Sequence, residues 1–383
     1  MQRGITLIKH IDMELAKIFQ AIEETRFLKK LSSKERLFLI GERESLEYIR
    51  QFLAQYKQSD LNYYCNLSAD SLEKSLAIAT QENLYRAIVI VSIKNEASLY
   101  QEVKSKLDIL GSNLTVLRLF SDIFINSMCD RELLIPSSEN FSKPRVSYAI
   151  LTTPRSGSTF FCDLLGSTKI AGYPSEHLRL AAQELAKYCN FDYLKLLHNL
   201  MEYRITSNGV FGTKFISHFL FELRGTKPNF RQIFKSIDKY ILLVRKDKVA
   251  QAVSLVLAQK TEIWHLRQND FKGNNKIDLY KSKLEDIKID NNLLLEVEQK
   301  HKFIQNQENR LKKILNANQK EALEVAYENI VDDPLTQIDL VLNHLDIEPL
   351  SKAIDIDSEI KKMPSNISQE IIRQYKHKKN YHI

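Results

Sequence analysis

The chain has 383 residues, of which 44% are hydrophobic and 27% charged, a composition typical of a globular protein long enough for two domains. Its 55 Lys and Arg outnumber its 48 Asp and Glu, and because this excess is spread along the chain, the sequence argues against a nucleic-acid-binding protein. No run of about eighteen apolar residues occurs, and charges interrupt residues 1–30, so we expect neither a membrane span nor a secretory signal.

The cysteines lie far apart and form neither a Cys-x-x-Cys pair nor a cluster with metal-ligand spacing. They are Cys65, Cys129, Cys162 and Cys189. We therefore expect buried, reduced thiols, a cytoplasmic location and no bound metal.

The first 120 residues show two kinds of pattern. Apolar residues at helical spacing between residues 8 and 30 predict a leading amphipathic helix. From residue 36 to residue 120, short apolar strands alternate with helical segments, which predicts a parallel sheet in a small Rossmann-like α/β domain. Gly41 follows the first strand, but the residues after it lack the G-x-G-x-x-G spacing, so a plain turn is favoured over a nucleotide loop.

Residues 136–144, PSSENFSKP, are rich in proline and serine and form the best linker candidate. We therefore expect a first domain over 1–140, of unknown role, and a second over 141–383. In the second, apolar runs predict strands at 146–153, 210–215, 240–244 and 322–327. Helices are expected from Ser158, over 248–261 and 279–316, after Asp333-Pro334, and at the C-terminus.

The most informative string is AILTTPRSGSTFFCDLL, an apolar strand followed by a polar loop and an apolar helix. Its loop, Pro154–Thr159, combines a glycine that permits close approach with hydroxyls, one guanidinium and a helix N-terminus, which together form an anion cradle. The triphosphatase loop G-x-x-x-x-G-K-[ST] is the rival, but serine stands where that loop has lysine. A serine-rich turn without a ligand is the simpler alternative.

At these residues the sequence resembles the sulfotransferases that use 3'-phosphoadenosine 5'-phosphosulfate (PAPS), and more narrowly the bacterial trehalose 2-sulfotransferase family. The resemblance rests on four blocks in order: LTTPRSGSTFFCDLLGSTKIAGYPSEHL, FGTKF, LLVRKDKVAQAVSLVLAQKTEIWH and VAYENIVDDP. It implies an α/β fold with a P-loop-like parallel sheet sandwiched by helices. The N-terminal 140 residues lie outside it, as an additional α/β domain.

The resemblance also implies roles for the loop and for a second basic site. Ser156, Gly157, Ser158 and Thr159 would bind the donor's 5'-phosphate, and Arg155 would stabilise charge on the leaving side. Arg245 and Ser254, nine residues apart in sequence, would hold the 3'-phosphate. Lys246 stands where the family often has a second arginine. A solvated basic turn is the alternative for this segment.

An acceptor hydroxyl must lose a proton, so a base is expected. The resemblance implies Glu176, with His265 as the second choice and with Trp264 and His265 as acceptor-pocket candidates. The expected acceptor is a carbohydrate or glycolipid hydroxyl, the co-substrate is PAPS without a metal, and a homodimer is plausible. A nucleotide-dependent kinase and a non-catalytic PAPS- or nucleotide-binding module are the alternatives.

Overall fold

The computed structural model describes residues 36–54, 62–65, 69–80, 85–137, 140–179, 191–222, 230–271, 275–348, 358–361 and 366–380, with Ile18, Ala182 and Leu185. The chain divides into two compact units. Unit 1 comprises Met1–Lys143, Leu178–Arg204 and Gly225–Phe230, and unit 2 comprises Pro144–His177, Ile205–Arg224 and Arg231–Ile383. Residues 178–204 follow the expected boundary yet group with unit 1, and a boundary within 136–144 remains a prediction. The leading helix expected over 8–30 lies outside the described residues, apart from Ile18.

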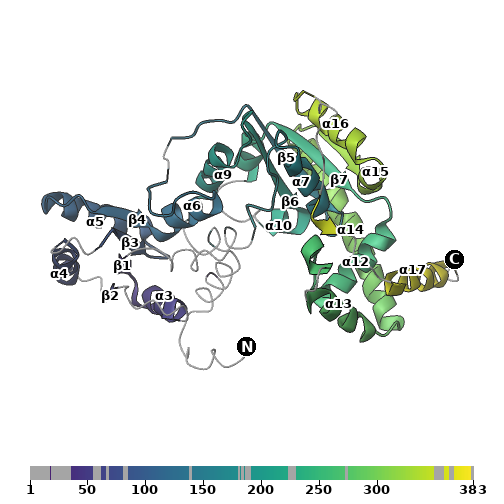
Figure 1. The fold of residues 1–383 in the computed structure, drawn as a ribbon, viewed down its shortest axis with the longest axis horizontal. Coiled ribbons are helices and arrows are strands. Elements are labelled where there is room, and N and C mark those ends of the chain that lie inside the picture. Colours follow the sequence, from purple (N-terminus) through teal and green to yellow (C-terminus); the bar gives the residue numbers. More distant parts are fainter. Residues whose placement is uncertain are drawn as a thin grey trace. The chain divides into compact units, whose positions relative to one another are not determined.

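Unit 1 contains a parallel sheet of order β2-β1-β3-β4. Its strands are β1 (Leu37–Gly41), β2 (Asn62–Cys65), β3 (Ala87–Val91) and β4 (Thr115–Arg118), and they alternate with α3 (Arg43–Ala54), α4 (Ala69–Thr80) and α5 (Glu96–Ile109), as the sequence predicts (Figure 1). Both β1 and β3 are buried along their whole length, which explains why their sequences are continuously apolar rather than alternating.

The turn after β1 is held by close packing at Gly41 and by hydrogen bonds to Glu42. A side chain at Gly41 would place its Cβ 1.7 Å from the Val91 carbonyl oxygen, so glycine is needed here for close packing against β3. The Glu42 carboxylate accepts hydrogen bonds from the Ser92 hydroxyl and from the Ile93 N–H at 3.2 Å. These contacts agree with a plain βα turn.

Three helical segments complete the described part of unit 1. Two of them were not predicted: a π-helix, η1 (Leu119–Phe124), and the short α6 (Ile125–Met128). Glu96 anchors η1 by accepting hydrogen bonds from the Phe120 N–H at 2.7 Å and the Ser121 hydroxyl at 2.6 Å. The third is α9 (Tyr193–Tyr203), which Asp192 caps by accepting from the Lys195 N–H.

Unit 2 contains a second parallel sheet, of order β6-β5-β7-β9. Its strands are β5 (Val146–Thr152), β6 (Val210–Ile216), β7 (Lys239–Val244) and β9 (Ala322–Ala326). The predicted strands are confirmed to within one residue at their ends. Tyr327, expected to end β9, begins α15 (Tyr327–Asp332) instead.

One face of this sheet packs against α7 (Ser158–Ser167) and α16 (Pro334–His344), in a core that joins Ile150 and Phe161 to Val341. Asp333 caps α16 by accepting from the Thr336 N–H, and Pro334 lies in its first turn, so this predicted helix start is confirmed.

A second core joins α12 (Lys248–Thr261), α13 (Asn275–Glu285), α14 (Asn291–Ala317) and α17 (Asn366–Asn380). The charged helical region expected over 279–316 contains two helices, because Asp290 caps a new one by accepting from the Leu293 N–H at 2.8 Å. The remaining described helices of unit 2 are α10 (Ser217–Glu222), α11 (Phe230–Ser236) and the 3-10 turn η3 (Gln268–Phe271). The antiparallel pair β8 (Leu266–Arg267) and β10 (Ile360–Lys361) was not predicted.

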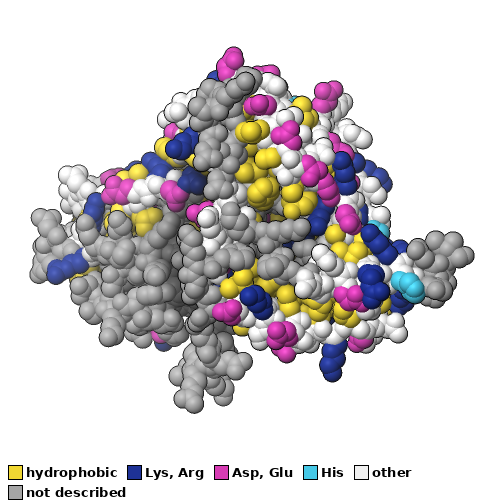
Figure 2. Space-filling model, turned by 45° about the vertical axis from the view of Figure 1, so that its right-hand side comes forward, with side chains coloured by type: hydrophobic (Ala, Val, Ile, Leu, Met, Phe, Trp, Pro, Cys, Tyr) yellow, Lys and Arg dark blue, Asp and Glu magenta, His cyan; other side chains and the backbone are white. Residues whose placement is uncertain are grey.

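The structure also bears on the expectations for the cysteines, for membrane spans and for the distribution of charge. Within the described residues, Cys129 and Cys162 are buried and free, and no helix is long and apolar enough to cross a membrane. On the face shown in Figure 2, Lys and Arg are interspersed with Asp and Glu among the atoms that are described. The charge pattern of that face therefore agrees with a net charge that is dispersed along the chain.

The parallel sheet of unit 2 determines where a site can form. The chain leaves β5 to reach β6 on one side and later returns to β7 on the other side of β5. In open α/β sheets, ligands bind outside the carboxyl ends of the strands at such a switch point. The loop 154–157 follows β5, Arg245 follows β7 and Tyr327 follows β9, so all three lie at that edge.

Candidate functional site

The loop after β5 presents a helix N-terminus. Gly157 caps α7 with a φ of +82°, and the Phe161 N–H donates to the Gly157 carbonyl oxygen at 3.0 Å. The N–H groups that precede Phe161 lie in the first turn, where a helix offers them no internal partner. Together with the positive end of the helix dipole, they form the anion cradle that the sequence predicts.

Hydroxyl groups connect the loop to the neighbouring strand. The Thr152 hydroxyl donates to the Leu243 carbonyl oxygen at 2.8 Å and lies 2.5 Å from the Ser156 hydroxyl. Ser156 is fully buried. Its hydroxyl therefore supports the loop from inside, so we expect Ser156 to meet a ligand through its N–H, whereas Ser158 and Thr159 lie in the first turn of α7.

A buried amide on α12 fixes the other side of the loop. The Nε2 of Gln251 donates to the Thr153 hydroxyl and to the Pro154 carbonyl oxygen, both at 2.8 Å. The side chain is fully buried, and its Oε1 has no hydrogen-bond partner among the described residues. Sequence reasoning missed Gln251, because one glutamine in an apolar helix has no distinguishing spacing.

Gly157 is required for two reasons, and Gly157→Ala tests both. A Cβ at this position would lie 2.2 Å from Cδ2 of Tyr327, and a left-handed backbone costs a non-glycine residue roughly 1–2 kcal/mol. We expect the alanine variant to melt at a lower temperature and to lose affinity for anions at the loop, measured by thermal unfolding and calorimetry.

Gly209→Ala is the matched control. Gly209 has a similar φ of +78° in the same unit, but its added Cβ would meet Arg145 Cβ only at 3.1 Å. The control should lower the melting temperature and keep anion affinity. Equal anion affinity in Gly157→Ala and wild type would contradict the cradle.

Arg155 connects the loop to α12 and to the segment that follows it. Its backbone is left-handed, with φ +62°. Its Nε donates to the Ser254 hydroxyl at 3.0 Å, and its Nη1 donates to the Trp264 carbonyl oxygen. Burial lowers the pKa of the guanidinium to about 10, and the nearby charge of Arg245 acts in the same direction. The group is still positively charged at neutral pH.

Arg245 lies beside the loop, at the end of β7. Its Nη1 donates to the Arg155 carbonyl oxygen at 3.4 Å, and its guanidinium lies 5.1 Å from the centre of the Tyr327 ring. Its Nε is buried and has no hydrogen-bond partner among the described residues. The structure places Ser254 on Arg155 rather than on Arg245. Lys246 points to the Asn329 amide oxygen at 2.9 Å and is exposed.

A lysine that sequence reasoning missed joins Glu176 to the loop. The Lys214 N–H on β6 donates to the Ser175 carbonyl oxygen at 2.9 Å, which holds the Glu176 segment along this strand. Its Nζ lies 2.9 Å from Glu176 Oε1 and 3.3 Å from the Thr159 hydroxyl. The available signal was a lysine within the otherwise buried strand VFGTKFI, where a charge needs a partner.

His265 is also close to the loop. Its Nε2 lies 3.4 Å from the Thr159 hydroxyl. Desolvation by surrounding atoms is the main cause that lowers its pKa to about 4, and the charges of Arg155 and Lys214 add to it, although the ring still reaches solvent. The imidazole is therefore neutral at pH 7. Neighbouring Trp264 is 44% exposed.

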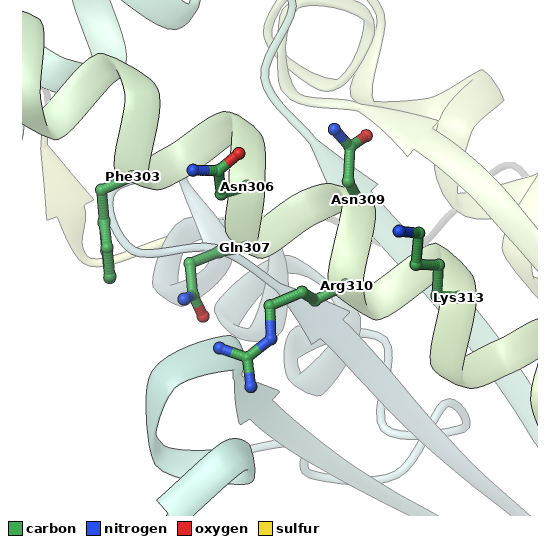
Figure 3. A pocket seen from close by; sticks show the side chains of 6 residues that line it. All are labelled: Phe303, Asn306, Gln307, Asn309, Arg310 and Lys313. Atoms are coloured by element: carbon green, nitrogen blue, oxygen red, sulfur yellow. The ribbon is translucent and has the colours of Figure 1, made fainter.

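One cavity of the described residues lies away from this loop. It measures about 480 Å³ and is bordered by α14 side chains, including Phe303, Gln307 and Arg310 (Figure 3). None of the sequence-predicted site residues borders it. We place the site at the strand ends, because cations, hydroxyls and a carboxylate converge there. The described residues contain no group of His, Cys, Asp and Glu that could hold a metal ion.

Comparison with known proteins gives a family model and similar solved structures. The model of the Stf0 sulphotransferase family matches residues 147–201 and 205–378, more than half of the chain. The sulfotransferase domain of the Synechococcus PCC 7002 olefin synthase is 14% identical, covers 63% of this chain and 90% of its own, and superposes with a TM-score of 0.29. That score is too low to support an argument. No curated protein matches the sequence.

Proposed function

The chain belongs to the Stf0 sulphotransferase family, and from this premise we propose that it transfers the sulfuryl group of PAPS to a hydroxyl of a carbohydrate or glycolipid. The observation that carries the proposal is the bridge from Glu176 through Lys214 to Thr159. It brings a carboxylate that can accept a proton next to a loop that can hold a phosphate.

The residues at the loop fit the donor. The first-turn N–H groups of α7 and the hydroxyls of Ser158 and Thr159 suit the 5'-phosphate. The Nε of Arg245 is buried and has no hydrogen-bond partner among the described residues, so it suits a second phosphate. Arg155 contacts both Arg245 and Ser254, so the Ser254 hydroxyl belongs to the same group of residues. Arginine forms short, charge-assisted hydrogen bonds to phosphate oxygens.

On the acceptor side, Glu176 would accept the hydroxyl proton while the acceptor oxygen forms its bond to sulfur and the bond from sulfur to the 5'-phosphate breaks. Arg155 would stabilise the charge that develops on the departing phosphate. His265 is the second candidate base, since its ring is neutral at pH 7. The exposed ring of Trp264 suits the apolar face of a sugar. Trehalose as acceptor, a cytoplasmic location and a homodimer belong to the proposal as expectations.

Calorimetric titration with PAP, the desulfated donor, tests the proposal in magnesium-free buffer. We expect wild type and Glu176→Ala to bind, and Arg155→Ala and Arg245→Ala to bind at least about tenfold more weakly, because a hydrogen bond to a charged group contributes about 1.5–3 kcal/mol.

Arg373→Ala is the matched control, because it removes one arginine that is paired with Glu370 on α17. It should bind PAP as wild type does. Absence of binding by folded wild type, together with magnesium-dependent turnover of ATP, would favour the kinase. Tight PAP binding without transfer to any acceptor in cell extracts would favour the non-catalytic module.

A further inference from the structure

The segment between α12 and β8, residues 262–265, has no regular secondary structure. It begins at Glu262, whose backbone is left-handed with φ +59°, and it carries the acceptor-pocket candidates Trp264 and His265. Two contacts join its second half to the Pro154–Thr159 loop, the proposed site of the sulfuryl donor. The Arg155 guanidinium donates to the Trp264 carbonyl oxygen, and the Thr159 hydroxyl lies 3.4 Å from His265 Nε2. The loop proposed to bind the sulfuryl donor therefore also contacts the residues proposed to line the acceptor pocket.

The Arg155 contacts to Trp264 and Ser254 are to neutral oxygens. A phosphate at the loop would offer charged oxygens, with which a guanidinium forms short and frequently bidentate hydrogen bonds. The five N–H donors of the guanidinium lie in one rigid plane, and Ser254 and Trp264 engage its Nε and Nη1. A guanidinium that turns this Nε–Nη1 edge toward a phosphate gives up its bond to the Trp264 carbonyl. The Arg155 guanidinium thus either faces a phosphate at the loop or holds residues 262–265 through the Trp264 carbonyl.

We propose that Arg155 is the positioning residue of the acceptor-side segment, and that donor binding shifts residues 262–265 by drawing Arg155 away from Trp264. This inference rests on the proposed function, because it requires an anionic donor at the loop. It predicts that donor binding precedes formation of the acceptor site. Linkage makes the effect reciprocal: the factor by which bound donor raises the affinity for an acceptor is also the factor by which bound acceptor raises the affinity for the donor.

Trp264 is the only tryptophan in the chain, so its fluorescence reports on this segment alone. Titration of the full chain with PAP should change the emission, and the change should saturate at the dissociation constant found by calorimetry. Arg155→Lys keeps the positive charge but cannot reach both Trp264 and Ser254 with a fork. We expect its ligand-free emission to resemble that of PAP-bound wild type, and PAP to change it much less.

Arg373→Lys should behave as wild type throughout. Heat of PAP binding without any change in Trp264 emission overturns the inference and leaves the proposed function intact. An undiminished emission change in Arg155→Lys also overturns it, because PAP would then act on the indole directly. If wild type binds no PAP, the proposed function fails. The role of Arg155 in positioning residues 262–265 is then tested without ligand, by the emission of Trp264 and its quenching by acrylamide. Equal emission and equal quenching in Arg155→Lys and wild type would reject that role.

Discussion

Glu176→Gln should lower kcat for sulfuryl transfer by at least about a hundredfold, because a positioned general base contributes roughly 10²–10⁴ in rate. Glutamine keeps the shape of the side chain and an oxygen that can face Lys214, so the bridge to Thr159 has the least reason to rearrange. PAP affinity should stay close to that of wild type. The measurement is single-turnover transfer from labelled PAPS to an acceptor recovered from extracts.

The matched variant is His265→Asn, which removes the other candidate base from the same loop. With Glu176 as the base, the asparagine variant should retain much more activity than the glutamine variant. The reverse order of the two rates would assign proton removal to His265. Loss of PAP binding in the glutamine variant would instead show that Glu176 supports the donor loop.

The strands and most helices could be predicted because each carries a local signal. Largely apolar runs predicted β5 and β7, and Asp333-Pro334 predicted the start of α16. The break between α13 and α14 was missed because both segments share a charged helical pattern, and residues 286–290, which end with the Asp290 cap, have no glycine or proline to mark it. The π-helix η1 was missed because its stability depends on Glu96, 24 residues before Phe120.

The loop of the candidate site was also visible in sequence, since its residues are adjacent to one another. Contacts between distant residues were not. Lys214 meets Thr159 across 55 residues, and Gln251 meets Thr153 across 98. Arg245 and Ser254 were expected to hold one phosphate together, as the family resemblance implies, and this stays a prediction. The contact of Ser254 with Arg155, 99 residues apart in sequence, was not visible in the sequence.

Lys214→Met should lower kcat by about a hundredfold, which is the typical cost of removing one preorganised donor from a catalytic site. Methionine is close in size to the aliphatic part of lysine and suits a side chain that is only 4% exposed, so we expect the fold to persist. The substitution would remove the ammonium that lies beside both Glu176 and Thr159. Lys214→Arg should restore part of the activity, and transfer from labelled PAPS measures all three proteins.

The double variant Glu176→Gln, Lys214→Met decides how Lys214 acts. If Lys214 only positions Glu176, the double variant should be no slower than Glu176→Gln alone, because residues that act as one unit are not additive. A further loss of about tenfold or more would mean that the ammonium also stabilises charge at the donor loop through its Thr159 side. Wild-type kcat in Lys214→Met would remove the bridge from the mechanism, and with it the observation on which the proposed function chiefly depends.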